Sequence, residues 1–206
     1  MYARSTTVQG NPESMDDVIT YVSGEVMPAL QDMSGCVGMS MLADRASGRC
    51  IITSAWADES AMHATEQTVR DFRDRAAQLM DGEHEAQAWE VAVMHRLHAG
   101  HDGACTRVIW SEGDPGRAED NRDTFRMMLL PRLEELPGFC SVSLMMDRAG
   151  GRSAAAFTYD SHEDMERATP AAMGLREQAA REMGLRVTEV AEFDLVLHHL
   201  RVPETV

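Results

Sequence analysis

The alternation of apolar and polar residues divides the first half of the chain into elements with clear boundaries. Ala3–Gln9 has the pattern of a short strand, and a Gly-Asn-Pro break follows it. Apolar residues then recur at helical spacing from Val18 to Leu30, which predicts a helix over about residues 14–32. Pro28 is expected to bend or loosen the last turn of this helix, because proline lacks the amide hydrogen that a helix interior uses.

A hairpin, a second helix and a last strand are expected next. Val37–Ala43 and Ile51–Trp56 are rich in strand-forming residues, and the loop between them has an Asp at its start and a Gly near its end. Asp58 is a plausible N-cap for a helix that runs to about Met80. Trp89–His98 closes the series as the last strand.

The same series occurs a second time. A shift of 103 positions lays the second half of the chain on the first without a gap. Identical pairs include Arg4 and Arg107, Pro28 and Pro131, Gly35 and Gly138, and His95 and His198. The second copy predicts strand Thr106–Glu112, helix 117–135, strands Cys140–Met146 and Ala154–Tyr159, a helix to about Met183, and strand Glu192–Arg201. Thr169-Pro170 is expected to kink or interrupt the second helix of this copy.

The repeated order, β-α-β-β-α-β, predicts an α+β fold of two tandem ferredoxin-like units. We place repeat 1 at residues 1–98, a linker at 99–104 and repeat 2 at 105–206. The helices of such a unit cover one face of its antiparallel sheet, so the other face needs cover as well. We therefore expect the two sheets to pack face to face into a barrel-like core with the helices outside.

Composition narrows the classes of partner. The formal net charge of -15 argues against binding to nucleic acid or to an anionic membrane, because either polyanion would be repelled. We see no signal peptide and no apolar run long enough to cross a bilayer. The four cysteines show no metal-type spacing, so we expect free thiols in a cytoplasmic protein.

With these features the chain resembles the dimeric α/β-barrel superfamily, and within it the antibiotic-biosynthesis-monooxygenase-like group, as a fused tandem repeat. Besides the element order, the resemblance rests on Leu136-Pro137-Gly138-Phe139 before a strand, on the Asp-Arg-x-x-Gly-Arg hairpin loop, and on Trp56 and Tyr159 before the second helices. The group includes cofactor-free oxygenases of polyketide-like phenols, haem-degrading enzymes, isomerases and proteins without known activity. The resemblance therefore implies the fold more narrowly than the reaction.

The haem-degrading branch of this group typically has an Asn in the first strand and an axial His on the second helix. This chain has Arg4, Thr6, Arg107 and Ile109 at the first-strand positions. His63 lies early in one second helix, and Glu166 takes its place in the other, with His162 nearby. The haem motif is not met, and we expect no cofactor.

The duplicated arginines and histidines are the candidate catalytic residues. Arg4 and Arg107 start the first strand of each copy, and His95 and His198 lie near the end of each last strand. These strands are antiparallel neighbours in the split βαβ order, so Arg and His are expected side by side once per copy. A guanidinium beside an imidazole suits a carboxylate, enolate or phenolate, with His as the base. Half-exposed structural residues tied to local carboxylates are the alternative interpretation.

Other chemistry-bearing residues give weaker hypotheses. Trp56, Trp110 and Tyr159 are candidate ligand-binding residues, although packing in the core or at its rim is the commoner role of such aromatics. His95, His98 and His101, with Cys105 beyond, are residue types that bind Zn²⁺. His95 and His98 should point to opposite faces of their strand, so the sequence predicts no metal site.

We therefore expect a monooxygenase-like small-molecule protein that oxidises an aromatic or polyketide-like compound without a cofactor. The alternative is a non-catalytic binding protein for a hydrophobic ligand or haem, and the sequence leaves open whether the protein is an enzyme. A third hypothesis is that the two copies have diverged and one of them keeps the pocket. The expected assembly is a monomer with an internal pseudo-dimer, or a homodimer.

Overall fold

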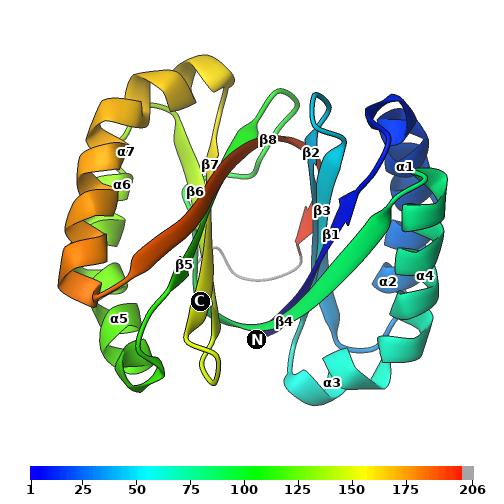
Figure 1. Ribbon diagram of the computed structural model, residues 1–206, viewed down its shortest axis with the longest axis horizontal. Coiled ribbons are helices and arrows are strands. Elements are labelled where there is room, and N and C mark those ends of the chain that lie inside the picture. The colour runs from blue at the N-terminus through cyan, green and yellow to red at the C-terminus, as the bar shows by residue number, and fades with distance from the viewer. Residues whose placement is uncertain (201–206) are drawn as a thin grey trace. The chain divides into compact units, whose positions relative to one another are not determined.

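The computed structural model describes residues 1–200 and shows the predicted element order in both halves of the chain (Figure 1). The elements of the first half are β1 (Tyr2–Gln9), η1 (Pro12–Ser14), α1 (Met15–Tyr21), η2 (Val22–Val26), α2 (Met27–Gln31), β2 (Cys36–Asp44), β3 (Arg49–Trp56), α3 (Glu59–Ala64), α4 (Glu66–Leu79) and β4 (Glu83–Arg96). The elements of the second half are β5 (Cys105–Glu112), η3 (Pro115–Arg117), α5 (Ala118–Thr124), η4 (Phe125–Leu129), α6 (Leu130–Leu133), β6 (Phe139–Asp147), β7 (Arg152–Tyr159), α7 (His162–Met183) and β8 (Arg186–Leu200).

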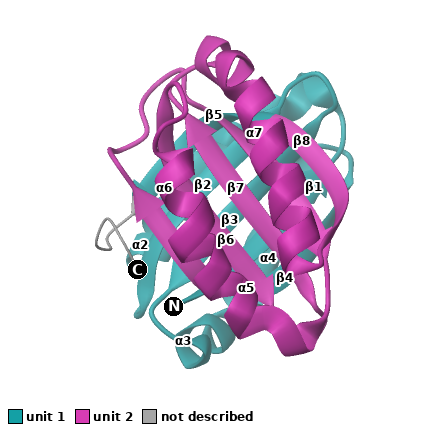
Figure 2. Ribbon diagram, turned by 90° about the vertical axis from the view of Figure 1, so that its left-hand side faces the viewer, with its two compact units in different colours: residues 1–89, 193–202 teal, residues 90–192, 203–206 magenta. Residues whose placement is uncertain are grey.

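The chain divides into two compact units, which Figure 2 colours separately. Among the described residues, unit 1 comprises 1–89 with 193–200, and unit 2 comprises 90–192. Each unit therefore contains most of one repeat and the end of the other repeat's last strand. The predicted repeat boundaries divide the sequence, whereas these units divide the folded chain, and residues 201–206 lie outside the described part.

Antiparallel pairing joins the strands of each unit. In unit 1, β3 lies between β1 and β2, and the end of β8 pairs with β2. In unit 2, β7 lies between β5 and β6, and the end of β4 pairs with β6. The hydrogen-bonded order of all eight strands is closed, as β1-β3-β2-β8-β5-β7-β6-β4. The predicted α+β fold, two tandem ferredoxin-like units that make a barrel, is confirmed.

Each unit has a core of its own, between its helices and one face of its strands (Figure 1). In unit 1 the core contains Trp56, Met41 and Val18, all fully buried. In unit 2 it contains Phe139, Tyr159 and residues of α7. A fully buried aliphatic or aromatic side chain contributes roughly 1.5–3 kcal/mol relative to an exposed one, so each core can support its own unit.

Pro28 and Pro131 alter the hydrogen bonding of the first helix of each copy one turn before the position that we predicted. Both helices contain a π turn, η2 or η4, that ends just before the proline. The amide of Met27 donates to the carbonyl of Val22, and that of Leu130 donates to Phe125, so each bond spans five residues instead of four. A proline leaves the carbonyl four residues before it without a partner, and the wider turn accommodates this loss.

The prediction for the last strands was wrong at their starts. β4 begins at Glu83 rather than Trp89, and β8 begins at Arg186 rather than Glu192. The first residues of both strands are largely exposed, and their few apolar residues show no regular alternation. β4 ends at Arg96, which leaves His98 in the following bend; the predicted end of the other strand, Arg201, lies outside the described residues.

We expected a kink or an interruption in the second helix of copy two, but the interruption lies in copy one. Pro170 lies inside α7 without ending it, whereas the first copy breaks at Thr65, between α3 and α4. Within residues 1–200, no helix has the length and apolar character needed to span a bilayer.

The hairpin loops explain the matched glycines. Gly48 and Gly151 have φ angles of +72° and +65°. A Cβ on either glycine would lie 2.2 or 2.3 Å from the carbonyl oxygen of Gly10 or Gly113. Only glycine has both the left-handed conformation and the space at these positions, so the repeat keeps it.

Candidate functional site

Unit 2 contains a cavity of about 240 Å³ between α7, the η4–α6 segment and the strands. Alternate residues of β5 and β7 line its floor, because successive strand residues point to opposite faces. Most of its lining is apolar, with Phe125, Leu144, Phe157 and Met183 among the lining residues. Met173 and Val190, from α7 and β8, also line it and are exposed large hydrophobic residues, so the cavity is accessible there from solvent.

Arg107 provides a buried charge in this apolar cavity. Its side chain is only 10% exposed and forms an ion pair with Glu192 of β8 at 2.6 Å. The guanidinium also donates to the hydroxyl of Thr169 on α7 at 2.8 Å, and that hydroxyl donates to the carbonyl of Met165. Strand and helix thus hold the arginine in one orientation, while Glu192 stays half-exposed.

Tyr159 adds a neutral polar group to the cavity. Its ring is 1% exposed and meets Phe139 edge to face, with 6.4 Å between the ring centroids. Burial raises the pKa of its phenol above the ordinary value of 10.0; Arg107 opposes the rise, and Glu192 adds to it. The phenol is therefore protonated at neutral pH and available as a hydrogen-bond donor.

This raised pKa predicts a pH effect on stability. The folded chain holds the Tyr159 proton more tightly than the unfolded chain. The contribution of this group to the free energy of unfolding is therefore complete below about pH 10, and it is lost as the pH rises through the pKa that Tyr159 has in the folded chain. We expect Tyr159→Phe to reduce the fall in unfolding free energy between about pH 9 and about pH 11, measured by urea denaturation. An equally steep fall in the variant would contradict the assignment.

In unit 1, larger side chains stand at three of the equivalent positions. Trp89 stands where unit 2 has Glu192; it is buried, and its indole N–H donates to the Ser5 hydroxyl at 2.7 Å. Ile52 and Val69 occupy the positions of the cavity-lining residues Ala155 and Ala172. Ile52 packs against the core of unit 1, and Val69 belongs to it. These three exchanges place more side-chain volume in unit 1 at positions that border the cavity in unit 2.

Arg4 is buried in unit 1 as Arg107 is in unit 2, but its counter-charge comes from a different element. Arg4 forms an ion pair with Glu66 of α4 at 2.5 Å and donates to the carbonyl of Met62 at 2.9 Å. Arg73 pairs with the same carboxylate. Burial alone would raise the pKa of Glu66, but Arg73 and Arg4 together hold it below the usual range. This cluster is an ion-pair network of two arginines and one carboxylate.

The predicted Arg–His pairs are not formed within either unit. Arg4 belongs to unit 1 and His95 to unit 2, while Arg107 belongs to unit 2 and His198 to unit 1. His95 lies opposite Val142 in the strand register and has an ion-pair contact with Glu134 at 2.8 Å. The long last strands cause this division, because their ends leave the unit in which they began.

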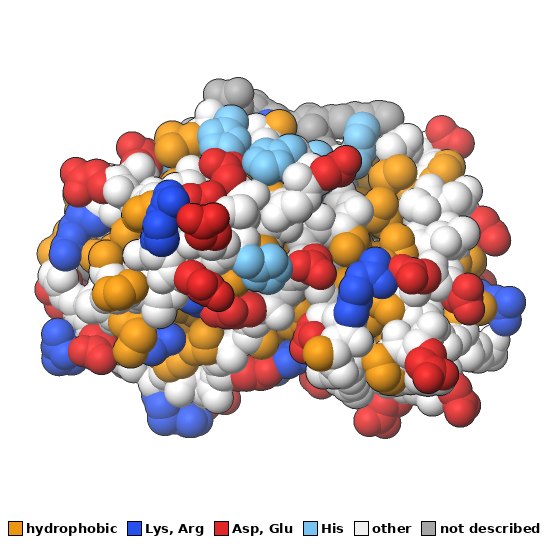
Figure 3. Space-filling model, turned by 90° about the horizontal axis from the view of Figure 1, so that it is seen from above, with side chains coloured by type: hydrophobic (Ala, Val, Ile, Leu, Met, Phe, Trp, Pro, Cys, Tyr) orange, Lys and Arg blue, Asp and Glu red, His pale blue; other side chains and the backbone are white. Residues whose placement is uncertain are grey.

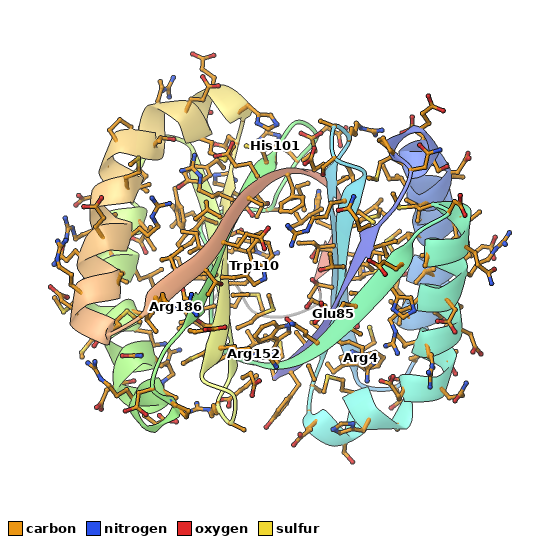
Figure 4. All side chains as sticks on the ribbon, viewed as in Figure 1. Arg4, Glu85, His101, Trp110, Arg152 and Arg186 are labelled. Atoms are coloured by element: carbon orange, nitrogen blue, oxygen red, sulfur yellow. The ribbon has the colours of Figure 1, made fainter. Side chains whose placement is uncertain are left out.

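The predicted ligand-binding aromatics have different environments. Tyr159 lines the cavity. Trp56 is fully buried in the core of unit 1, where its indole N–H donates to the Ser54 hydroxyl at 3.1 Å. Trp110 is half-buried and is not among the lining residues, since it points to the opposite face of β5 from Arg107 and Ile109 (Figure 4).

No cysteine forms a disulfide, as expected. Burial raises the pKa of the Cys50 thiol to about 12, and burial followed by the charge of Asp160 raises that of Cys140. Neither thiol is an activated nucleophile in the chain alone, because the reactive form is the thiolate. Figure 3 shows carboxylates spread over the visible face rather than gathered into one patch, in keeping with the net charge of -15.

Sequence reasoning missed Glu192 and Thr169. Each departs from the repeat, because the first copy has Trp89 and Glu66 at the equivalent positions. Arg4 and Arg107 are identical in the repeat, whereas Glu192 and Thr169 have no identical counterpart. This contrast was the sequence signal that could have identified the two residues.

Comparison with known proteins identifies the family to which the chain belongs. Residues 1–75 match the family model "Antibiotic biosynthesis monooxygenase". The uncharacterized protein Rv2558 of Mycobacterium tuberculosis is 46% identical over 207 residues, an alignment that covers 100% of this chain and 88% of that protein.

Two solved structures share the fold along almost the whole chain. FN1347 of Fusobacterium nucleatum superposes with a TM-score of 0.72 at 11% identity, covering 97% of this chain and 94% of its own. An anthrone oxidase-like protein superposes with a TM-score of 0.66 at 12% identity, covering 98% of this chain and 94% of its own. At such identities the likeness concerns the fold alone.

Proposed function

We propose that unit 2 binds a small aromatic compound in its cavity and oxidises it with O₂. The proposal proceeds from the family: the chain belongs to one family with Rv2558 of M. tuberculosis and to the antibiotic-biosynthesis-monooxygenase-like group. The observation that carries this proposal is the apolar cavity with a buried arginine, a carboxylate and a protonated phenol among its lining residues. Apolar walls with a few fixed polar groups are typical of small-molecule sites.

The size of the cavity limits the ligand. Its volume of about 240 Å³ lies below the roughly 300–1,000 Å³ of sites for drug-sized ligands and above the ~150 Å³ that holds benzene. A compound of two or three fused rings, partly exposed at the mouth beside Met173, suits this space. No histidine is among the lining residues, so the cavity offers no axial imidazole for haem.

The polar groups can stabilise an anion of such a compound. Glu192 is half-exposed and can take a proton from an acidic C–H or phenolic O–H group. Arg107 is charged and held by Glu192 and Thr169, so it can stabilise the resulting enolate or phenolate in an environment of low polarity. Tyr159 can donate a hydrogen bond to the same oxygen.

For an anthrone-type substrate the reaction balances without another reductant. Glu192 removes a proton from the ring methylene, and the carbanion adds to O₂ as a peroxide anion, which is protonated. Loss of the remaining C–H proton breaks the O–O bond. One oxygen atom stays as the new carbonyl, and the other leaves as water. The substrate supplies all the electrons, so one CH₂ group and one O₂ give one C=O group and one H₂O.

Aerobic oxidation of anthrone tests the proposal. We expect the purified protein at neutral pH to consume one O₂ per anthrone above the uncatalysed rate, and one ¹⁸O atom from ¹⁸O₂ to enter the product carbonyl. Binding without O₂ uptake would instead support the alternative function, non-catalytic binding of a hydrophobic ligand in the same cavity. Failure of anthrone and of smaller quinols to bind would reject both functions.

A further inference from the structure

Three metal-binding side chains meet at one end of unit 2, and a fourth, His101, contacts one of them. His98 and His101 lie in the segment after β4, Cys140 lies on β6, and Asp160 lies between β7 and α7. The ligand atoms of His98, Cys140 and Asp160 all lie within 4.8 Å of one another. Figure 4 shows His101 near the start of α7, and Asp160 lies two residues before that helix begins.

The distances from the two histidines to Asp160 are similar to those between ligands of a small tetrahedral ion. His98 Nε2 lies 3.5 Å and His101 Nε2 lies 3.2 Å from the same oxygen, Asp160 Oδ1. Nitrogen and oxygen ligands about 2.1 Å from a tetrahedral Zn²⁺ lie about 3.4 Å apart. The Cys140 thiol is buried and donates to the backbone carbonyl of His98 at 3.3 Å, so its sulfur lies against the same segment.

The imidazole hydrogen bonds supply a second, independent observation. Nδ1 of His98 lies 3.2 Å from the carbonyl of Ala99, and Nδ1 of His101 lies 2.9 Å from the carbonyl of Asp102. A carbonyl oxygen only accepts, so both Nδ1 atoms carry hydrogen, and Nε2 of each ring is the atom that faces Asp160. Metal-bound histidines are commonly oriented in this way by a backbone carbonyl.

The two positive charges of a divalent cation would balance the Cys140 thiolate and the Asp160 carboxylate. Thiolate and imidazole ligands favour Zn²⁺ over Mg²⁺ or Ca²⁺.

We propose that His98, His101, Cys140 and Asp160 form a Zn²⁺ site that ties the linker between the repeats to unit 2. The first copy has Val37 and Ala57 at the positions of Cys140 and Asp160, so the fold does not require these side chains. The chain between Arg96 and Ala104 is not part of a strand or helix, and a bound ion would fix it to the ends of β6 and β7.

Metal titration of the full chain, purified free of metal, tests this site. We expect one Zn²⁺ per chain by calorimetry. Co²⁺ should give a thiolate-to-metal charge-transfer band and tetrahedral d–d absorption, and Zn²⁺ should displace it. Amide hydrogen exchange across residues 97–104 should become slower when Zn²⁺ is bound. A protein that binds no Zn²⁺, or Co²⁺ without a thiolate band, would overturn the proposal.

Variants assign the ligands. Cys140→Ser and His98→Ala should each weaken Zn²⁺ binding at least a hundredfold. His101→Ala changes only a half-exposed side chain, and it should weaken binding at least tenfold even if the buried Cys140 variant folds poorly. Cys36→Ser and His63→Ala in unit 1 are the matched controls and should bind as the native chain does. Equal affinity in the native chain and the His98 and His101 variants would reject the site.

Discussion

Arg107→Met is expected to lower kcat/KM for anthrone oxidation at least a hundredfold. The substitution keeps most of the apolar stem of the side chain but removes the charge that would stabilise the substrate anion. Removal of one group that stabilises an oxyanion typically costs about 10²–10³ in rate, or roughly 2.7–4 kcal/mol. Glu192 stays half-exposed and can be solvated, so the variant should fold. Steady-state kinetics, with circular dichroism to confirm folding, measure the effect.

Arg186→Met is the matched control for this prediction. Arg186 lies on the same strand as Glu192 and pairs with Glu112, but its side chain is 70% exposed. A surface pair of this kind contributes little, so both kcat/KM and stability should stay near the native values. Equal losses for Arg4→Met and Arg107→Met would contradict the assignment of the site to unit 2.

Filling the cavity with the residues of the other repeat is expected to abolish ligand binding without loss of stability. Ala155→Ile and Ala172→Val introduce the side chains that stand at the equivalent positions in unit 1. Together they add five carbon atoms to a space of about 240 Å³. We expect the Kd for an aromatic ligand to rise at least about a hundredfold, which corresponds to roughly 2.7 kcal/mol.

The stability of the filled variant separates this effect from unfolding. Empty apolar space reduces stability, so its partial filling should leave the melting temperature unchanged or raise it. Ala171→Val, at an exposed position of the same helix, controls for a β-branched residue in α7 and should bind like the native chain. A filled variant that retains native affinity would mean that the ligand binds elsewhere.

The repeated pattern was sufficient to predict the order of elements, the hairpin loops and the helix boundaries within a few residues. Gly48 and Gly151 show why, since a close carbonyl and a positive φ fix these positions in both copies. The starts of β4 and β8 could not be predicted in the same way. Their first residues are largely exposed and show no regular apolar alternation, so the local pattern does not predict them as strands.

The candidate site was predicted only in part, because its members depend on tertiary structure. Arg107 and Tyr159 were identified from the repeat and the resemblance, and both line the cavity. Glu192 and Thr169 become partners of Arg107 only where β8 and α7 meet β5. The predicted neighbours His95 and His198 depend on where the long last strands leave their units, which no local pattern records.

An anaerobic titration with anthrone tests the central claim most directly, because exclusion of O₂ separates binding from turnover. For the native chain we predict one bound anthrone per chain. For the chain with Ala155→Ile and Ala172→Val we predict none at the same concentrations. Two sites per chain, or one site that survives the filling of unit 2, would contradict the account.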